Sequence, residues 1–237
     1  MLMNVVDIAI VGKDVGVVNA YSSVEKALKL AASFTSTCVN IHWIDSHNLN
    51  KNNINDLLKG YQGILIPGGF NYDGVEGMIL AISYARKNNI PFFGICLGMQ
   101  LAVIEYARNV AGLPLATSGE FDKDSSYKVI DRLPNLKEGL REGSFPVLLK
   151  EGSLINNCYQ SLSINEAFRH GYNLNNEYRD LLKEKGLILS AFSDNGFVEA
   201  VELSNHPFYI GVQFHPELSY PDKPHPLFIN FLKATSK

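Results

Sequence analysis

The chain has 237 residues, of which 46% are hydrophobic and 19% charged, so it can bury a sizeable core and is not intrinsically disordered. Its 24 acidic and 21 basic side chains give a formal net charge of -3, which argues against nucleic-acid binding and against a polybasic membrane signal. No apolar run reaches the length of about 20 residues that a membrane span needs, and the three cysteines form no CxxC pair, so we expect a cytoplasmic protein without a structural zinc site.

The first 110 residues alternate between short apolar runs and amphipathic stretches. The apolar runs are rich in β-branched residues and predict buried strands over residues 5–12, 38–44, 63–69 and 90–96. The amphipathic stretches predict helices over residues 21–34, 54–60, 75–88 and 97–113. This alternation predicts an α/β fold, with a doubly wound, mostly parallel sheet that helices cover on both faces.

After residue 113 the pattern changes to strands that follow one another closely with turn sequences between them. These strands are predicted over residues 145–150, 187–192, 197–203 and 208–214. We expect them to be antiparallel strands that extend or flank the sheet, accompanied by helices over residues 177–185 and 226–234. No repeat, linker or break in composition divides the chain, so we expect residues 1–237 to form a single domain.

The strongest local motif is GICLG at residues 94–98, where a predicted strand meets a predicted helix. Small residues two places before and two places after a nucleophile are typical of a nucleophile elbow, because a Cβ at either place would clash in the tight turn. A cysteine at a helix N-terminus is also favoured as a thiolate by the helix dipole. The motif predicts Cys96 as a nucleophile, with a buried structural cysteine as the alternative.

A second motif, GVQFHPE at residues 211–217, ends a predicted strand. A thiol nucleophile needs a base that takes its proton, and the base needs a third group that orients it. His215 is suited to the first role and Glu217 to the second. Taken alone, His215 would be interpreted as an ordinary histidine at a strand end, and its catalytic interpretation depends on the cysteine elbow.

A third motif, Gly68-Gly69, follows the predicted strand that lies beside the strand of the elbow. In a doubly wound sheet, ligands bind beyond the carboxyl ends of the strands. A Gly-Gly turn leaves backbone N–H groups accessible, as a tetrahedral oxyanion requires. Together the three motifs predict cysteine-dependent acyl transfer on an α/β sheet.

These motifs resemble those of the class I, triad-type glutamine amidotransferases, and in particular the glutaminase domain of CTP synthase. Further segments match in the same order: VGKDVGVVNAYSSVEKAL, IPGGFNYDGVEGM, TSGEFD, FRHGYNLNNEYR and KPHPLF. The resemblance covers nearly the whole chain and implies the flavodoxin-like fold of that family.

The resemblance also implies a reaction, the hydrolysis of glutamine to glutamate and ammonia. Cys96 would attack the side-chain amide and form a glutamyl thioester, which water then cleaves. His215 would transfer protons, Glu217 would orient His215, and the backbone N–H groups of Gly69 and Leu97 would bind the oxyanion. No cofactor and no metal ion are implied.

The substrate pocket is implied by the same resemblance, with Glu120 pairing with the α-ammonium group of glutamine. The residues that would line this pocket are Phe70, Gln100, Glu120, His170, Gly171 and Tyr172.

The chain departs from the family pattern at several positions. Gly171 stands where the family has an arginine that binds the α-carboxylate of the substrate, so we expect weaker binding of free glutamine and open space at this position. Asn71 and Asp73 replace a glycine and an arginine, and Asp73 reverses a charge near the pocket mouth. No P-loop sequence GxxxxGK[ST] occurs, so we expect the ATP-using synthetase domain to be absent.

Three hypotheses follow. The chain could be a glutaminase subunit that passes ammonia to a separate, CTP synthase-like synthetase. It could instead use the same triad on a different γ-glutamyl amide or peptide, as the loss of the arginine suggests. It could also be a non-catalytic regulatory or binding homologue, which the presence of all three triad residues disfavours. We predict the first, with a small-molecule substrate and neither nucleic acid nor membrane as partner.

Overall fold

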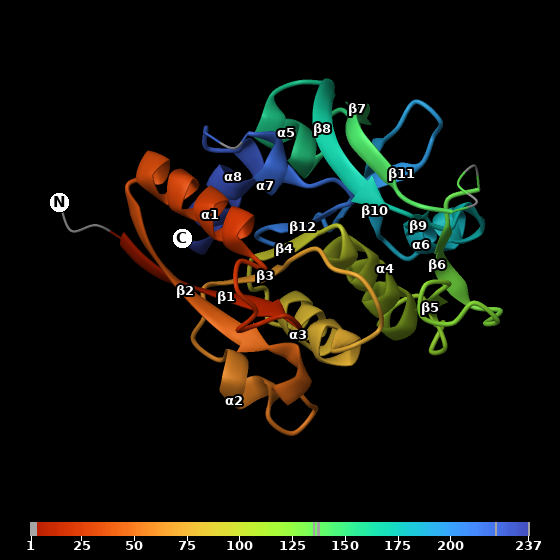
Figure 1. Cartoon of the computed structure of the whole chain (residues 1–237), viewed down its shortest axis with the longest axis horizontal. Helices are drawn as coiled ribbons and strands as arrows, with labels where there is room; N and C mark the ends of the chain where they lie inside the picture. Colours follow the sequence, from red (N-terminus) through yellow and green to blue (C-terminus); the bar gives the residue numbers. More distant parts are fainter. Residues whose placement is uncertain (1–3, 135, 137, 221, 237) are drawn as a thin grey trace.

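The described part of the chain consists of a large central sheet with helices on both faces and a smaller sheet at one side (Figure 1). The structure is a computed structural model that describes residues 4–134, 136, 138–220 and 222–236. The strands are β1 (Asn4–Gly12), β2 (Thr37–Asp45), β3 (Gly63–Ile66), β4 (Phe92–Ile95), β5 (Thr117–Ser118), β6 (Lys128–Arg132), β7 (Arg141–Leu149), β8 (Ser163–His170), β9 (Tyr172–Leu174), β10 (Ile188–Phe192), β11 (Val198–Glu202) and β12 (Tyr209–Val212). The helices are α1 (Ser22–Thr35), α2 (Ile54–Leu58), α3 (Val75–Lys87), α4 (Leu97–Asn109), α5 (Leu154–Tyr159), α6 (Arg179–Glu184), α7 (Pro216–Ser219) and α8 (Pro226–Thr235), with 3-10 turns η1 (Ser46–Asn48) and η2 (Asn176–Tyr178).

One end of the large sheet is parallel, as the sequence predicts. The strand order is β2-β1-β3-β4-β12-β11-β10-β7-β8, and the pairings from β2 to β12 are all parallel. The central strands β3 and β4 are buried along their whole length, which is why their sequences are continuous apolar runs. The order 2-1-3-4-12 is that of a flavodoxin-like doubly wound sheet, so ligands are expected at the carboxyl ends of these strands.

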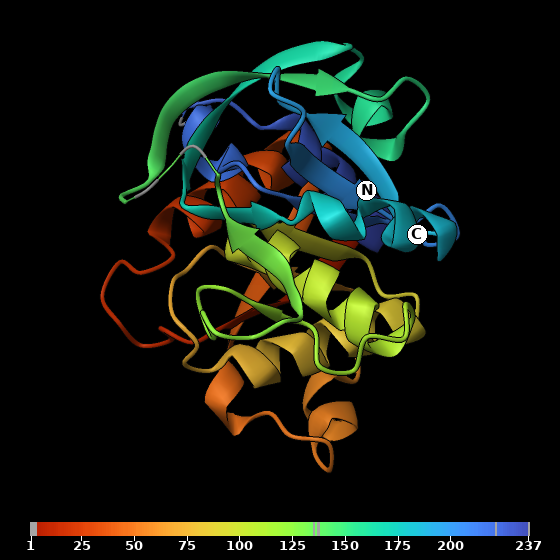
Figure 2. The same ribbon diagram turned by 90° about the vertical axis from the view of Figure 1, so that its right-hand side faces the viewer.

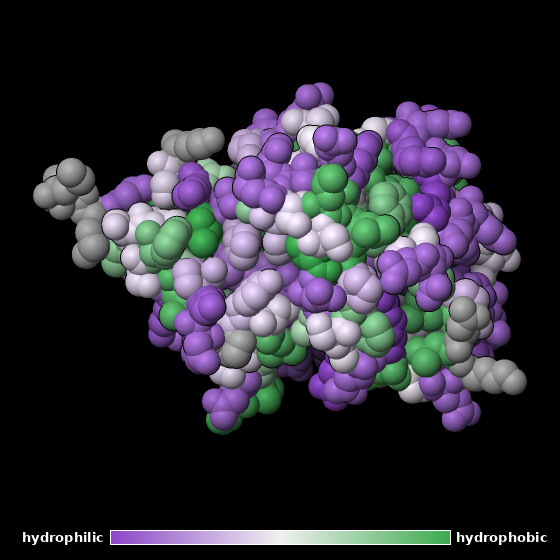
Figure 3. Space-filling model, turned by 90° about the horizontal axis from the view of Figure 1, so that it is seen from above, coloured by the Kyte–Doolittle hydropathy of each residue, from purple (hydrophilic) through white to green (hydrophobic). Residues whose placement is uncertain are grey.

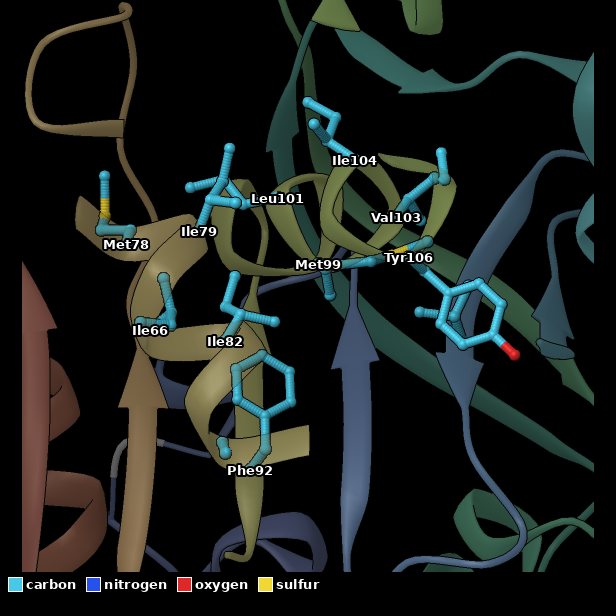
Figure 4. Packing of buried hydrophobic residues seen from close by; sticks show 14 of the residues in the cluster. Ile66, Met78, Ile79, Ile82, Phe92, Met99, Leu101, Val103, Ile104 and Tyr106 are labelled. Carbon is cyan, nitrogen blue, oxygen red and sulfur yellow. The ribbon is translucent and has the colours of Figure 1, made fainter. Parts of the chain in front are cut away.

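Helices cover the two faces of this parallel region with separate apolar layers. On one face α3 and α4 pack against the sheet, and Figure 4 shows Ile79 and Ile82 of α3 in a cluster with Leu101 of α4 and Phe92 of β4. On the other face α1 and α8 pack against the sheet. The apolar stripes of the predicted helices are therefore the surfaces that bury the sheet.

The other end of the large sheet is antiparallel. The strands β12, β11, β10, β7 and β8 pair antiparallel in this order, and the long β7–β8 hairpin lies at one end of the molecule, opposite α2 (Figure 2). The four strands predicted for this region are present as β7, β10, β11 and β12. The prediction needs one correction, because β12 pairs in parallel with β4 on its other side.

Several elements were not predicted. Among them are β8, α5, α7, η1 and the second sheet, whose order is β5-β6-β9. The strand β8 alternates between buried and exposed residues, but its buried positions include Glu166 and His170, so its sequence lacks an apolar pattern. The helix α5 has the sequence LINNCY, which offers little apolar periodicity.

None of the described helices combines the length and the apolar character needed to cross a bilayer. The face in Figure 3 is mainly hydrophilic, and its hydrophobic residues lie in separate patches.

Candidate functional site

The carboxyl ends of β3, β4 and β12 meet at one edge of the parallel region, where they form a cavity of about 390 Å³. The glycine turn after β3 contributes Gly68 and Gly69, and the residue after β4 is Cys96. His215 and Glu217 follow β12. The three sequence motifs therefore converge at the place where a doubly wound sheet binds its ligand.

Cys96 lies at a strained turn between β4 and α4. Its backbone has φ 50° and ψ −101°, which an L-residue adopts rarely. A Cβ on Gly94 would lie 2.8 Å from the carbonyl of Gly98, and a Cβ on Gly98 would lie 2.3 Å from the carbonyl oxygen of Ile66. The spacing GxCxG is thus required by close backbone packing, as in a nucleophile elbow.

His215 lies between the other two members of the predicted triad. Its Nδ1 lies 2.7 Å from Oε1 of Glu217, and its Nε2 is buried without a hydrogen-bond partner among the described residues. His215 and Cys96 line the same cavity, and a Cβ on Gly68 would lie 2.9 Å from Cε1 of His215 and 3.6 Å from Cβ of Cys96. Burial disfavours the charged ring, but the nearby Cys96 and Glu217 outweigh burial and raise the pKa of His215 to about 11. The site therefore strongly favours a proton on this imidazole.

Two backbone amides lie next to the cysteine. Leu97 is the first residue of α4, and a Cβ on Gly69 would lie 3.2 Å from its side chain, so the two residues are neighbours. Among the described residues, neither amide donates a hydrogen bond to a protein acceptor. Both N–H groups are therefore free of protein acceptors in the described structure, and their role in binding an oxyanion stays a prediction.

Two further groups contact the cysteine and were not singled out from the sequence. The Nε2 of Gln213, a fully buried residue, lies 3.6 Å from the sulfur of Cys96. The thiol itself lies 3.9 Å from the carbonyl oxygen of Arg169 on β8. The position of Gln213 two residues before His215 was the available signal, since alternate residues of an extended segment share a face.

Of the residues predicted to line the substrate pocket, Gln100 and Tyr172 are joined directly. Nε2 of Gln100 donates to the backbone carbonyl of Tyr172 at 2.9 Å and to Oε1 of Gln213 at 3.2 Å. Oε1 of Glu120 accepts the backbone N–H of Asn71 at 2.8 Å, which brings Glu120 to the turn that carries the exposed Phe70. Their contacts with a substrate stay predictions.

His170 and Gly171 have surroundings that the sequence did not reveal. The His170 side chain is buried, its Nδ1 lies 2.9 Å from the Tyr172 carbonyl, and burial lowers its pKa to about 4. We expected open space at Gly171, and this expectation was wrong. A Cβ there would lie 3.2 Å from the carbonyl oxygen of Gly139 and 3.3 Å from Nη1 of Arg132.

The segment after the glycine turn is held by ionic and polar contacts. Asp73 pairs with Nε2 of His47 at 3.0 Å, and Nδ1 of the same ring lies 2.7 Å from Asp45. Lys13 donates to the carbonyl of Phe70. Asp73, which reverses the charge at this position, thus has a local partner in His47.

In the part of the chain that the structure describes, no group of three or more His, Cys, Asp or Glu residues could hold a metal ion.

Comparisons with known proteins support one family. The family model for glutamine amidotransferase class-I matches residues 16–234. The CTP synthases of Caldanaerobacter subterraneus subsp. tengcongensis and Carboxydothermus hydrogenoformans are 48% and 49% identical to the chain. These matches cover 97% and 98% of this chain but 44% and 45% of the relatives, so the chain spans less than half of their length.

Solved structures agree with this result. The glutaminase domain of Trypanosoma brucei CTPS, with bound acivicin, has a TM-score of 0.92 and 36% sequence identity, over 97% of this chain and 93% of that domain. A glutamine amidotransferase from Thermotoga maritima has a TM-score of 0.56 at 15% identity over 97% of this chain and 96% of its own, which shows a shared fold. The chain therefore belongs to the class-I glutamine amidotransferase family, and it is similar over almost its whole length to the glutaminase domain of CTP synthase.

Proposed function

We propose that the chain hydrolyses the side-chain amide of glutamine to glutamate and ammonia through a thioester on Cys96. The convergence of Cys96 at the strained elbow with the hydrogen-bonded His215–Glu217 pair in one cavity is the observation that carries this proposal. A nucleophile, a base and an orienting carboxylate in this order are what cysteine-dependent acyl transfer requires.

In the first half of the reaction the Cys96 thiol gives its proton to His215, and the sulfur attacks the amide carbon. The oxygen of the resulting tetrahedral intermediate accepts the backbone N–H groups of Gly69 and Leu97. The carbon–nitrogen bond then breaks, and His215 returns the proton to the leaving nitrogen, which departs as ammonia. A glutamyl thioester remains on Cys96.

In the second half a water molecule attacks the thioester carbon while His215 accepts its proton. The carbon–sulfur bond breaks, glutamate leaves, and the proton of His215 restores the thiol. Glu217 accepts from Nδ1 of the ring and presents Nε2 to the thiol. The raised pKa of His215 favours a thiolate on Cys96 paired with a protonated ring before the substrate binds.

We further propose that the ammonia serves a synthetase of the kind found in the relatives named CTP synthase. Those relatives are more than twice as long as the region that this chain matches, and the additional length is where a second activity would be located. The proposed acceptor of the ammonia is thus supported by the similarity to CTP synthases, whereas the proposed hydrolysis is supported by the geometry around Cys96.

The first experiment measures glutamate release from L-glutamine by the wild type and by Cys96→Ala. Because the proposed intermediate is bonded to this sulfur, we expect the rate to fall about a thousandfold or more. Cys158→Ala is the matched control, because burial raises the pKa of that thiol to about 12 and no role is assigned to it. Hydrolysis that survives in Cys96→Ala would rule out the mechanism.

A second arm tests the substrate. Wild-type protein is offered L-glutamine and a set of γ-glutamyl amides and dipeptides, and kcat/KM is compared. We expect glutamine to be the best substrate, and acivicin, which is bound in the trypanosome domain, to block its hydrolysis. A higher kcat/KM for a γ-glutamyl peptide would contradict the proposed substrate while leaving the mechanism intact.

A further inference from the structure

The position beside Gly171 is filled by a guanidinium from another strand. A side chain at residue 171 would leave the backbone toward Nη1 of Arg132, which lies 3.3 Å from the place of the missing Cβ. The carbonyl oxygen of Gly139 and Cδ2 of Leu140 complete this environment at 3.2 and 3.6 Å. The glycine therefore removes a side chain from a place where a positive charge is nevertheless present.

The small sheet brings Arg132 to this place. Arg132 is the last residue of β6 and pairs with Tyr172 of the antiparallel strand β9, so it lies across from the residue that follows Gly171. Its guanidinium lies over the Tyr172 ring, with Cζ 5.3 Å from the ring centre. Nε donates to the carbonyl of Leu136 and Nη2 to the carbonyl of Gly139, each at 3.0 Å. These contacts position the group from a strand other than the one that carries Gly171.

The charge of Arg132 is not neutralised by a described carboxylate. Its neighbour Asp131 faces Gly119 on the other side of the strand and pairs with Lys128. Carbonyl groups hold Nε and Nη2, and among the described residues Nη1 donates no hydrogen bond. Carbonyl groups thus hold the guanidinium in place through two of its nitrogens, and the third nitrogen can donate hydrogen bonds to an anionic ligand.

Other arginines near the site differ in this respect. Arg141 is paired with the buried Glu199 at 2.6 Å, and Arg169 faces Glu142 at 3.8 Å. Both have an acidic partner in the described structure, and the Arg141–Glu199 pair is largely buried. Arg169 lines the cavity of Cys96, but its partner Glu142 is as exposed as Arg169 itself. Arg132 differs from both arginines in its place, because its Nη1 lies 3.3 Å from the position of the missing Cβ of residue 171.

The backbone that leads from the cysteine to Arg132 has a suitable length. The thiol of Cys96 lies 3.9 Å from the Arg169 carbonyl, and Arg132 lies beside residues 171 and 172. Only the bend at residue 171 separates the end of β8 from the start of β9. Two residues span at most about 7 Å, which is comparable to a glutamine molecule measured from its side-chain amide to its α-carboxylate. This short separation is compatible with a glutamine whose amide lies at Cys96 and whose carboxylate lies at Nη1.

The α-ammonium group of an amino-acid substrate also has a complementary group nearby, the carboxylate of Glu120. The strand β5 pairs in parallel with β6, with Ser118 beside Ile130. Two residues further along each chain are Glu120 and Arg132, which form no ion pair with each other. Glu120 lies in the turn after β5, where it accepts the backbone N–H of Asn71, and Arg132 is the last residue of β6. A carboxylate and a guanidinium that are not paired with each other match the ammonium and carboxylate of a free α-amino acid.

We propose that Arg132 binds the α-carboxylate of the substrate, in place of a side chain at residue 171, and so makes the site specific for free glutamine. The inference rests on the proposed glutaminase activity and adds a specificity-determining residue to it. It also removes the main reason to expect a substrate with a blocked carboxylate, since the space at Gly171 already contains the charge that would bind a free one.

The test compares L-glutamine with its α-amide, in which the carboxylate is replaced by a neutral amide. In Arg132→Met we expect KM for glutamine to rise about 10- to 100-fold, the usual effect of a lost hydrogen bond to a charged group, with little change in kcat. The kcat/KM for the α-amide should stay within about threefold of wild type, because this substrate offers no charge to Arg132.

Arg179→Met is the matched control. Arg179 likewise lies over an aromatic ring, with Cζ 5.3 Å from the centre of Phe192, and donates to a carbonyl, that of Gly196. We expect this variant to keep the wild-type KM. The double variant Arg132→Met, Gly171→Arg should recover much of the glutamine affinity, because the new arginine leaves the backbone toward the vacated place.

The outcomes separate the two proposals. An unchanged glutamine KM in Arg132→Met overturns the role of Arg132, and an equal loss for glutamine and its α-amide shows a merely structural role and overturns it as well. Thermal melting of each variant shows whether it is folded. If folded wild-type protein hydrolyses neither compound, the proposed glutaminase function is itself wrong and the Arg132 proposal fails with it.

Discussion

The two ends of the large sheet bury different kinds of side chain. The parallel end, from β2 to β12, packs apolar strands between apolar helix faces, and Cys96 and His215 follow its strands β4 and β12. The antiparallel end encloses charged groups, such as Arg141 with Glu199 and Glu166 with His225. Close apolar packing therefore holds the strands that precede Cys96 and His215, whereas paired charges hold the strands of the antiparallel end together.

The largest effect should come from breaking the buried pair at the antiparallel end. Arg141→Met leaves the fully buried carboxylate of Glu199 without its partner, and we expect the free energy of unfolding to fall by about 3–5 kcal/mol at pH 8. Burial, opposed by Arg141, already raises the pKa of Glu199 to about 7. Because a raised folded-state pKa gives more stability at low pH, the loss should be smaller at pH 5.5.

Denaturant unfolding of single and double variants checks this prediction. Arg141→Met combined with Glu199→Gln removes the uncompensated charge, so it should be more stable at pH 8 than Arg141→Met alone. A loss in Arg141→Met that is equal at both pH values would show that packing, and not charge, supports this end of the sheet.

A smaller effect is expected from His170, which burial keeps neutral with a pKa of about 4. The unfolded state binds a proton near pH 6.5 and the folded state does not, so stability should fall as the pH drops from 6.5 toward 4. The loss that this histidine contributes is about 3 kcal/mol when complete. In His170→Gln this part of the acid dependence should disappear, and an unchanged pH profile would contradict the assignment.

The smallest effect concerns the parallel end. Gly98→Ala places a Cβ 2.3 Å from the backbone oxygen of Ile66, and we expect a loss of about 1–3 kcal/mol. The loss should be the same from pH 5.5 to 8, because no titratable group takes part. Gly119→Ala is the control, since its Cβ would meet the movable carboxylate of Asp131, and its melting temperature should change less. A loss of stability in Gly98→Ala that depends strongly on pH would contradict the conclusion that packing, and not charge, supports the parallel end.

The parallel end was largely predictable because its signals are local. Strands buried on both faces must be apolar throughout, so β3 and β4 are visible as short runs such as GILI. The elbow is visible because Gly94 and Gly98 are each required by a contact with backbone atoms. The antiparallel end was less predictable. Oε1 of the buried Glu166 of β8 is held by Tyr159 and by His225, and His225 is 59 residues away in the sequence.

The amino-acid pattern alone was sufficient to establish the α/β architecture, the elbow at Cys96 and the order of the motifs, because periodicity and glycine spacing act over a few residues. The folded chain was needed to show that Gln213 contacts the cysteine and that Arg132 fills the place beside Gly171. Both contacts join residues that only strand pairing brings together, so no window of the sequence contains them.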